Sequence, residues 1–264
     1  MDKSPQQLRL NKFLAERLGV SRREADDLIV NGKIIVNGTP AVTGVKVDKS
    51  DKVCYNGKTI PFGVDFLYLA LNKPVGYVCS RRSQGAPTIY ELLPKKYHGL
   101  KTVGRLDKDS SGLILLTNDG DFAFAMTHPS FRKNKVYEVE LDHVLEPLHQ
   151  QMISEYGVEL PDGPSKFKVI RREDATPSFS GALRGASPSL TPSKEASHPH
   201  NDYKSPSKEV SQAHYIVILS EGRNRQIRRT FAALGYTVTK LHRTQFGKYE
   251  LGDLKPGKYV IIEP

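Results

Sequence analysis

The chemistry that this chain could perform centres on one acid-rich stretch, VGRLDKDSSGLILLTNDGD, at residues 103–121. Asp107 follows Arg105 and Leu106 where a loop rich in Gly and Ser runs into an apolar segment. An aspartate in such a place is commonly an ordinary turn or cap residue, because its side chain bonds the local backbone. The alternative is a single carboxylate that a nearby arginine holds and that acts as a nucleophile or base. Local chemistry favours the turn residue and leaves the functional role open.

The acidic residues of this stretch do not predict a metal centre. Asp109, Asp119 and Asp121 could suggest a site for a hard metal ion, but Asp119-Gly120-Asp121 is more typical of a turn after a strand. Cys54 and Cys79 have no cysteine or histidine at ligand spacing. We therefore expect no metal site, and the two cysteines fit a reducing cytoplasm.

A second candidate is the segment SEGRNRQIRRTFAALG at residues 220–235, which holds four arginines within seven residues. The spacing of three and four among Arg225, Arg228 and Arg229 predicts one basic face of a helix, opposite an apolar face. Such a stripe can simply be solvated. Here it begins at a helix N-terminus just after a glycine, which favours contact with phosphate. The four arginines are Arg223, Arg225, Arg228 and Arg229, and the apolar face holds Ile227, Phe231 and Leu234.

A third basic group lies near the N-terminus, where a Ser-x-x-Glu capping box at Ser21 and Glu24 predicts a short helix. Arg22 and Arg23 occupy its first turn, and Lys33 follows its end. We expect these three residues to contact an anionic partner, with Lys12 and Arg17 extending the patch. Solvation of an exposed face remains the alternative for each of them singly.

The elements expected around the N-terminal group form a compact helix–helix–hairpin unit. Helical spacing over residues 10–18 ends at Gly19, and the second helix ends at Gly32. Residues 33–36 then predict a strand, and Asn37-Gly38 predicts a hairpin turn. We expect this domain to span residues 1–61 and a second domain to span residues 62–264.

The second domain is expected to be built mainly of strands. Apolar strands are predicted at residues 66–73, 112–118, 135–142 and 213–220, and a helix is predicted near residues 227–234. In the third strand, Val136, Glu138 and Glu140 alternate with Tyr137, Val139 and Leu141, which predicts an antiparallel sheet with one exposed face. Strands and helices do not alternate regularly along the chain, which predicts an α+β fold with a mixed, mainly antiparallel sheet. Tyr137 lies in the third strand, where a tyrosine is more often packed in the core than used as a substrate platform.

A stretch at about 175–212, rich in Ser, Pro, Gly, His and Lys, interrupts this pattern. It has hardly any large apolar residues, so it cannot bury enough surface to offset its ordering entropy. We interpret it as a flexible insertion between two strands rather than a binding segment.

Charge is distributed unevenly over the 264 residues. The chain has a formal net charge of +10, of which +4 falls in residues 1–61 and +5 in residues 213–264, while residues 62–174 are neutral. This pattern indicates a polyanionic partner that the two ends hold. No apolar run approaches the roughly 20 residues of a membrane span, and the start lacks the apolar core of a signal peptide. We therefore expect a cytoplasmic protein without membrane contact.

Beyond their local chemistry, the motifs resemble a known family. Gly104-Arg105-Leu106-Asp107, followed by Ser-Gly-Leu and then LLTNDG, resembles the catalytic motif of pseudouridine synthases in the form of the RsuA family, bacterial enzymes that modify small- and large-subunit ribosomal RNA. The N-terminal unit resembles the αL RNA-binding motif that this family shares with a small-subunit ribosomal protein. Four motifs lie in the expected order: NKPVGYVCS, GRLDKDSSGLILLTNDG, KVYEVEL and EGRNRQIRR.

The resemblance implies an isomerase that flips a uridine out of folded RNA, breaks the bond from ring nitrogen to ribose, rotates the uracil and rejoins it through a ring carbon. By this resemblance Asp107 is the essential carboxylate, and Tyr137 stacks on the target uracil and can assist proton transfer. Arg228 pairs with the carboxylate and keeps it ionised. Leu219 packs beside the base, and Arg105 contacts the substrate. No metal or organic cofactor is implied, since the reaction involves no net redox change.

The implied partner is structured RNA, either ribosomal RNA or a ribosomal assembly intermediate, bound by a monomer. Two alternatives stay open: a non-catalytic RNA-binding or ribosome-assembly protein on the same fold, and the same chemistry on transfer RNA. Two departures from the family also stand out. Ser110-Ser111 occupies a place where the family often has threonine, and the insertion at about 175–212 is longer and more polar than expected.

Overall fold

The computed structural model describes residues 7–63, 65–172 and 213–264. The insertion expected at about 175–212 therefore lies outside the described residues. Within the described chain, contacts define two compact units. The first contains the residues up to Tyr137 together with Leu219–Arg223 and Leu241–Pro264, and the second contains Glu138–Ile218 and Asn224–Lys240. This division does not test the domain boundary predicted at residue 61, which stays a prediction.

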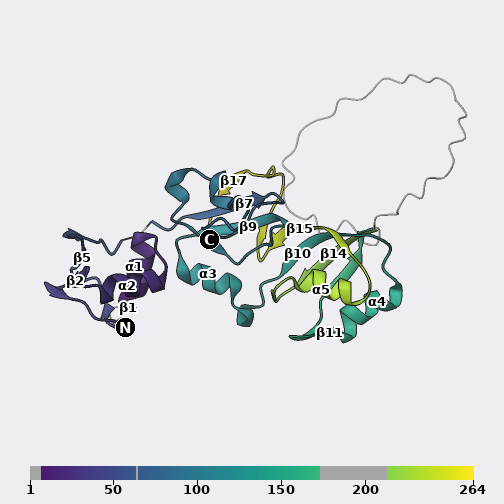
Figure 1. The fold of residues 1–264 in the computed structure, drawn as a ribbon, viewed down its shortest axis with the longest axis horizontal. Coiled ribbons are helices and arrows are strands. Elements are labelled where there is room, and N and C mark those ends of the chain that lie inside the picture. The colour runs from purple at the N-terminus through teal and green to yellow at the C-terminus, as the bar shows by residue number, and fades with distance from the viewer. Residues whose placement is uncertain (1–6, 64, 173–212) are drawn as a thin grey trace, which may run out of the picture. The chain divides into compact units, whose positions relative to one another are not determined.

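The N-terminal part of the first unit has the predicted helix–helix–hairpin order (Figure 1). Helix α1 (Leu10–Leu18) ends at Gly19, which adopts the left-handed conformation with φ 69°. Helix α2 (Arg22–Val30) carries the predicted capping box: the Ser21 side chain accepts from the Glu24 N–H, and the Glu24 carboxylate accepts from the Ser21 N–H. Two antiparallel sheets complete it, one of β1 (Leu8–Arg9) with β4 (Lys46–Val47), and one in the order β3 (Thr39–Pro40), β2 (Ile34–Val36), β5 (Val53–Tyr55), β6 (Lys58–Thr59).

A second hairpin in this part was not predicted. Strands β5 and β6 pair antiparallel across Asn56-Gly57, whose φ angles of 48° and 75° match those that a tight hairpin turn requires. This Asn-Gly pair is the same signal that predicted the β2–β3 hairpin at Asn37-Gly38.

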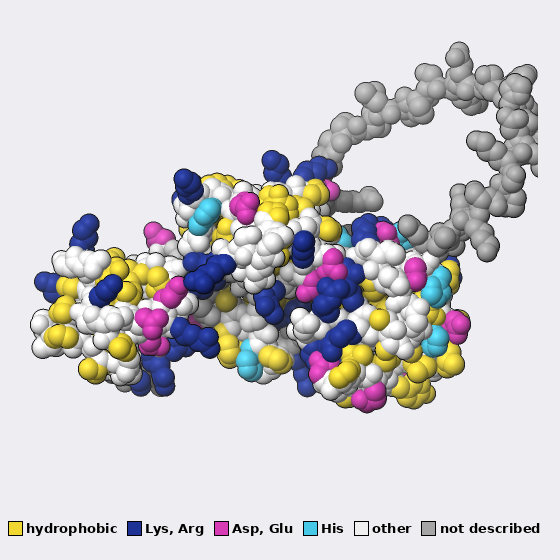
Figure 2. Space-filling model, in the orientation of Figure 1, with side chains coloured by type: hydrophobic (Ala, Val, Ile, Leu, Met, Phe, Trp, Pro, Cys, Tyr) yellow, Lys and Arg dark blue, Asp and Glu magenta, His cyan; other side chains and the backbone are white. Residues whose placement is uncertain are grey.

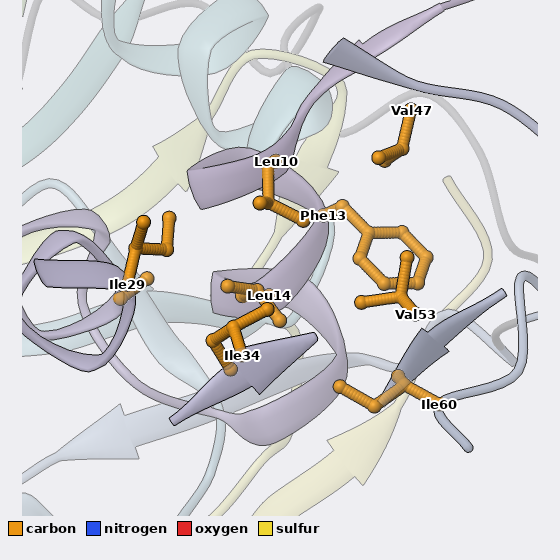
Figure 3. Close-up of a cluster of buried hydrophobic side chains, with 9 residues drawn as sticks. Leu10, Phe13, Leu14, Ile29, Ile34, Val47, Val53 and Ile60 are labelled. Carbon is orange, nitrogen blue, oxygen red and sulfur yellow. The ribbon is translucent and has the colours of Figure 1, made fainter. Parts of the chain in front are cut away.

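These helices and strands enclose a hydrophobic core of their own (Figure 3). Phe13 and Leu14 of α1 are completely buried, as are Ile34 of β2 and Val53 of β5. Burying each such side chain contributes roughly 1.5–3 kcal/mol. The core thus holds α2, which carries Arg22 and Arg23, in a fixed orientation. The labelled members are Leu10, Phe13, Leu14, Ile29, Ile34, Val47, Val53 and Ile60.

The rest of the first unit is a mixed sheet with strand order β10–β15–β9–β7–β17. Strands β7 (Tyr68–Lys73) and β9 (Ser111–Thr117) pair antiparallel over six residues, and β17 (Tyr259–Ile261) pairs antiparallel with β7 (Figure 1). Strand β15 (Val238–Phe246) runs parallel to β9. Two short strands also pair with central strands of this sheet: β8 (Lys101–Val103) pairs with β9, and β16 (Tyr249–Glu250) pairs with β15. Short 3-10 turns lie at Ile89–Leu92 and Lys95–Tyr97.

One expectation for this sheet was wrong. Asp119-Gly120-Asp121 is not merely a turn, because Asp119 is the N-cap of helix α3 (Gly120–Thr127) and its side chain accepts from the N–H groups of Asp121 and Phe122. The same bonding capacity that favours aspartate in turns favours it at helix starts. Helix α3 then leads through a 3-10 turn at Pro129–Phe131 into β10 (Lys135–Leu141).

The second unit contains the remaining parts of β10 and β15, and its strand order is β13–β14–β10–β15. Strand β10 buries Tyr137, Val139 and Leu141 and half-exposes the residues between them, as its alternation predicted. Helix α5 (Gln226–Ala233) starts one residue later than the arginine spacing requires. The unit's other elements are α4 (Pro147–Gln151), a π-helical turn at Met152–Tyr156, β11 (Val158–Leu160), β12 (Gly163–Ser165), β13 (Lys168–Arg171) and β14 (Ala213–Leu219).

The elements together confirm the predicted α+β fold with a mixed, mostly antiparallel sheet. In the described part of the chain, no helix has the length and apolar character needed to cross a bilayer.

Candidate active site

Asp107 lies in the loop between β8 and β9, which we call the Asp107 loop (residues 104–110). Gly104 opens it with a φ of 72°, and the Asp107 carbonyl accepts from the Ser110 N–H at 3.1 Å. A neighbouring turn after β7 fixes the loop from the side, since the Gly76 N–H donates to the Lys108 carbonyl at 2.8 Å. The loop is therefore held by backbone hydrogen bonds at the half-buried Asp107 and at the residue after it.

Cys79 holds the same loop from another direction. Its thiol donates to the Leu106 carbonyl at 3.3 Å, and the Leu106 N–H donates back to the sulfur at 3.4 Å. Burial raises the pKa of the Cys79 thiol. A thiol that stays protonated keeps its donor role, so Cys79 is suited to positioning the loop rather than to nucleophilic chemistry.

A buried lysine underlies the loop. Lys73, the last residue of β7, is completely buried, and its ammonium donates to the Ser110 and Pro74 carbonyl oxygens. Burial lowers the Lys73 pKa, and the negative charges of Asp109 and Asp107 oppose that shift. The lysine thus places a buried positive charge beside the loop that carries Asp107.

Gly112 brings β15 unusually close to β9 just after the loop. A Cβ at Gly112 would lie 2.2 Å from the Arg243 carbonyl oxygen, and its φ is 104°. This close approach aligns Arg243 with Gly112 and His242 with Ser111 in the parallel register. The Ser111 hydroxyl and the His242 Nδ1 lie 2.8 Å apart. A glycine is therefore required for the two strands to meet here.

Arg243 is the largest fully buried side chain of the described residues, at 2% exposure. Its Nε donates to the Leu113 carbonyl at 2.7 Å. Its guanidinium carbon lies 4.9 Å from the Phe246 ring centre and 6.0 Å from that of Tyr137. The ring of Tyr137, itself 8% exposed, is thus backed by a buried cation.

Lys135 extends this positive environment along β10. Its ammonium donates to the Glu221 carbonyl at 3.2 Å and lies 5.4 Å from the Phe246 ring centre. Burial lowers the Lys135 pKa, and the nearby Arg243 charge lowers it further. Leu219, which ends β14, is buried at 5% exposure, and Arg223 follows it half-buried, with its guanidinium 3.5 Å from the Glu221 carboxylate.

The other three arginines predicted in residues 220–235 belong to the second unit. Arg228 donates to the Val238 carbonyl at 2.7 Å, which links α5 to the start of β15. Arg229 forms a two-pronged ion pair with Asp162 at 2.8 and 2.9 Å, and this partner raises the Arg229 pKa. Arg225 is exposed and lies before α5 in the left-handed conformation, with φ 47°. The prediction that Arg225 shares a helix face with Arg228 and Arg229 is therefore wrong, because the helix begins at Gln226.

The predicted RNA-contacting residues of the N-terminal part are exposed on α2 and just after it. Arg22, Arg23 and Lys33 are all exposed, and the Arg22 guanidinium donates to the Asn11 side chain at 3.1 Å. Lys12 instead bonds Asp121 at 2.7 Å, and Arg17 bonds Glu16 at 3.1 Å. Lys and Arg side chains occur over much of the face in Figure 2, interspersed with Asp and Glu.

The structure thus collects part of the predicted set in one unit. Asp107, Arg105, Tyr137 and Leu219 belong to the first unit, and Arg228 belongs to the second. The pairing of Asp107 with Arg228 stays a prediction.

Sequence reasoning missed two buried cations of this unit. In the sequence Lys73 marks only the start of a Lys-Pro-x-Gly turn, and Arg243 carries no signal at all. Among the residues that the structure describes, no three His, Cys, Asp or Glu side chains gather as a metal site.

Comparison with known proteins now identifies the class. Residues 67–233 match the family described as RNA pseudouridylate synthase, and residues 8–53 match the S4 domain. The chain belongs to the RNA pseudouridylate synthase family. It is an RNA pseudouridine synthase, an isomerase with an RNA-binding S4 domain ahead of its catalytic fold. These matches support the enzyme over the non-catalytic alternative.

Individual relatives agree with this class. The ribosomal small subunit pseudouridine synthase A of Pasteurella multocida is 34% identical over 259 residues, which cover 96% of this chain and 94% of the relative. The ribosomal large subunit pseudouridine synthase B of Pseudomonas aeruginosa is 33% identical over 260 residues, covering 95% of this chain and 58% of the relative. A crystal structure of a pseudouridylate synthase is 28% identical, with a TM-score of 0.60 over 97% of this chain and 96% of that chain.

Proposed function

We propose that this enzyme converts a specific uridine of ribosomal RNA to pseudouridine and that Asp107 is its essential carboxylate. The observation that carries the proposal is the Asp107 loop, which backbone bonds, Cys79 and the buried Lys73 hold in one conformation. A catalytic group must be positioned closely to react with a bound base. An ordinary turn aspartate would need neither a buried ammonium beneath it nor a thiol bracing its neighbour.

In this proposal the reaction conserves all atoms of the nucleotide. The bond from ribose C1′ to uracil N1 breaks, the uracil rotates, and a bond from C1′ to C5 forms. The proton on C5 leaves and N1 gains one, so no oxidant, reductant or cofactor is consumed. Asp107 would act as a carboxylate on a loop to which the buried Lys73 ammonium is bonded.

Tyr137 and Leu219 would hold the flipped base, and Arg228 would pair with the Asp107 carboxylate. The Tyr137 ring has little freedom, because it is buried and Arg243 lies behind it. A ring fixed in this way is suited to stack on uracil. Arg105 is exposed on the Asp107 loop, where it can reach the RNA backbone on either side of the flipped nucleotide.

The names of the relatives and the N-terminal part support ribosomal RNA as the proposed substrate. The relative that the chain spans almost end to end is named for the small ribosomal subunit. The second is named for the large subunit, but the chain spans 58% of it. Structured RNA would be bound by three cations of the N-terminal part, Arg22, Arg23 and Lys33. Three arginines of the C-terminal segment would also contact it: Arg223, Arg225 and Arg229. We propose that the enzyme acts as a monomer in the cytoplasm, on rRNA or an assembly intermediate.

The experiment is to map pseudouridine chemically in unmodified transcripts of 16S rRNA, 23S rRNA and tRNA after incubation with wild-type protein or with Asp107→Asn. We expect one or a few sites in rRNA with the wild type and none with the variant. Modification of the tRNA alone would contradict the claim that ribosomal RNA is the substrate. Equal modification by both proteins would contradict the claim that Asp107 is the essential carboxylate.

A further inference from the structure

Three aromatic side chains lie exposed at the end of helix α3 and in the turn after it. Phe124 is 54% exposed and Phe131 is 47% exposed, and His128 between them is also exposed. Their rings contact one another: the Phe124 and His128 centres are 4.6 Å apart, those of Phe124 and Phe131 5.9 Å, and those of His128 and Phe131 6.4 Å. We call this group the aromatic cluster.

The backbone holds the aromatic cluster in place. The His128 Nδ1 accepts from the Ser130 N–H at 3.3 Å, and the His128 N–H donates to the Phe124 carbonyl at 2.9 Å. Arg132, with φ 44°, ends the turn. Exposed rings on such a fixed turn lose little conformational entropy when a ligand covers them.

The aromatic cluster adjoins the Asp107 loop. Thr127, the residue before His128, packs against the start of that loop, since a Cβ at Gly104 would lie 3.6 Å from the Thr127 methyl group. The segment after the cluster is also anchored, because the Asn134 carbonyl accepts from the Gly247 N–H at 2.8 Å. The cluster therefore lies on an element packed against the loop that carries Arg105 and Asp107.

The charge around the cluster favours a polyanion over an ordinary protein surface. Residues 122–137 contain no Asp or Glu, while Arg132, Lys133 and Lys135 lie within five residues of Phe131. Apolar rings on a basic background attract nucleic acid, whose bases stack and whose phosphates pair with cations. The chain has no tryptophan, so stacking on RNA bases must use Phe, Tyr, His or Arg side chains.

We propose that the aromatic cluster stacks an unpaired base of the RNA substrate that flanks the target uridine. A base that has left its helix exposes both π-faces, and Phe124 and Phe131 offer sequence-tolerant partners for one of them. This contact would hold the RNA strand open beside the Asp107 loop while the uridine is flipped. The inference rests on the proposed action on RNA at that loop.

The test measures equilibrium binding of the full chain to unmodified 16S and 23S rRNA transcripts and to a continuous RNA duplex. The proteins are wild type, Phe124→Ala/Phe131→Ala and Phe131→Leu. Tyr156→Ala is the matched control, since Tyr156 is an aromatic residue of the second unit that is 73% exposed. We expect the double variant to bind the preferred transcript roughly tenfold to a hundredfold more weakly. Its duplex affinity and its dependence on salt should stay unchanged, and Tyr156→Ala should bind like the wild type.

Wild-type affinity of the double variant for both transcripts would overturn the proposal, and would favour a protein partner for these rings. An equal loss on the duplex, or a reduced salt slope, would assign the effect to backbone contacts and overturn it too. If the double variant does not fold, Phe131→Leu decides, because it keeps an apolar side chain and removes the ring. Tight RNA binding by the wild type without pseudouridine formation would contradict the proposed function. The binding affinities of the variants could still be compared in that case, so the stacking proposal would be tested separately.

Discussion

At the scale of single residues, the candidate site combines a half-buried carboxylate with two buried cations. The Lys73 ammonium donates hydrogen bonds to two carbonyl oxygens, and the Arg243 Nε donates to the Leu113 carbonyl. Burying a charge without a carboxylate partner costs several kcal/mol unless other groups compensate. Buried charged side chains of this kind are characteristic of functional sites, where a fixed electrostatic field matters more for the reaction than the stability of the fold.

Tyr68 offers a prediction on pH and stability. Its hydroxyl donates to Asp119 at 2.8 Å, and burial together with this carboxylate raises the Tyr68 pKa to about 12 from its ordinary 10.0. The folded state then holds the proton more tightly than the unfolded state, so this stabilisation is complete below pH 10 and is lost as pH rises toward 12. We expect the unfolding free energy to fall more steeply in this window for the wild type than for Tyr68→Phe.

Urea unfolding of both proteins from about pH 8 to about pH 12 makes the comparison. Lys73, Lys101 and Lys135 have lowered pKa values and shift stability in the opposite direction, but they are common to both proteins. If the free energy of unfolding falls with pH equally in the two proteins, Tyr68 does not contribute to the loss of stability at high pH.

The sequence made Asp107 and Tyr137 candidates because they fall in motifs that resemble those of a known family, although local chemistry alone favoured a turn residue and a core residue. It could not identify Arg243, because an arginine in an amphipathic strand looks like an exposed residue. Its burial depends on the tight crossing at Gly112, and its bond to the Leu113 carbonyl joins strands that lie 130 residues apart in the chain. Such a contact has no local signal.

At the scale of elements, the parallel pairing of β9 with β15 is the feature that brings Arg243 under the site. Gly112→Ala would place a Cβ against the Arg243 backbone and force a φ of 104° on a residue with a side chain. We expect a loss of at least about 3 kcal/mol of unfolding free energy, because steric overlap and backbone strain add.

Gly32→Ala is the matched control. Gly32 also has a positive φ, of 66°, but a Cβ added there would meet nothing within 4 Å. It should cost about 1–2 kcal/mol, the penalty of the left-handed conformation alone. Thermal and urea denaturation of both variants measures the difference, and equal losses would mean that the strand crossing is not tightly packed.

Most elements were predictable because hydrophobic period and cap residues agree. The Ser21–Glu24 capping box and the alternation of β10 are of this kind, and both are confirmed. Helix α3 was missed because it is short and apolar nearly all round, so no periodic face distinguished it from a loop after a strand. The start of α5 was misplaced because Arg225 has a left-handed backbone that an arginine rarely adopts.

At the scale of the whole molecule, the uneven charge predicts how RNA is held. Residues 1–61 carry a net charge of +4, and their exposed cations lie on elements with a separate hydrophobic core. We expect Arg22→Gln/Arg23→Gln/Lys33→Gln to weaken rRNA binding and to lower the slope of log affinity against log salt by about two.

A variant with the same loss of charge controls for net charge. Lys95, Lys96 and Lys255 are exposed outside the N-terminal part, and their triple Gln variant should leave the slope close to that of the wild type. Salt titrations of binding to the 16S and 23S transcripts give both slopes. If the two triple variants have the same slope, Arg22, Arg23 and Lys33 contribute only to the net charge of the protein and do not form specific contacts with RNA.

The most direct test of the account is the release of the uracil C5 hydrogen by Asp107→Asn. When C5 becomes bonded to ribose, its hydrogen must leave to solvent, so rRNA labelled with tritium at uracil C5 reports each turnover. In single-turnover reactions we expect wild type to release tritium, and Asp107→Asn to bind the same RNA with similar affinity but release tritium at less than about one-thousandth of that rate. Release by Asp107→Asn at the wild-type rate would contradict the central claim that Asp107 is the essential carboxylate.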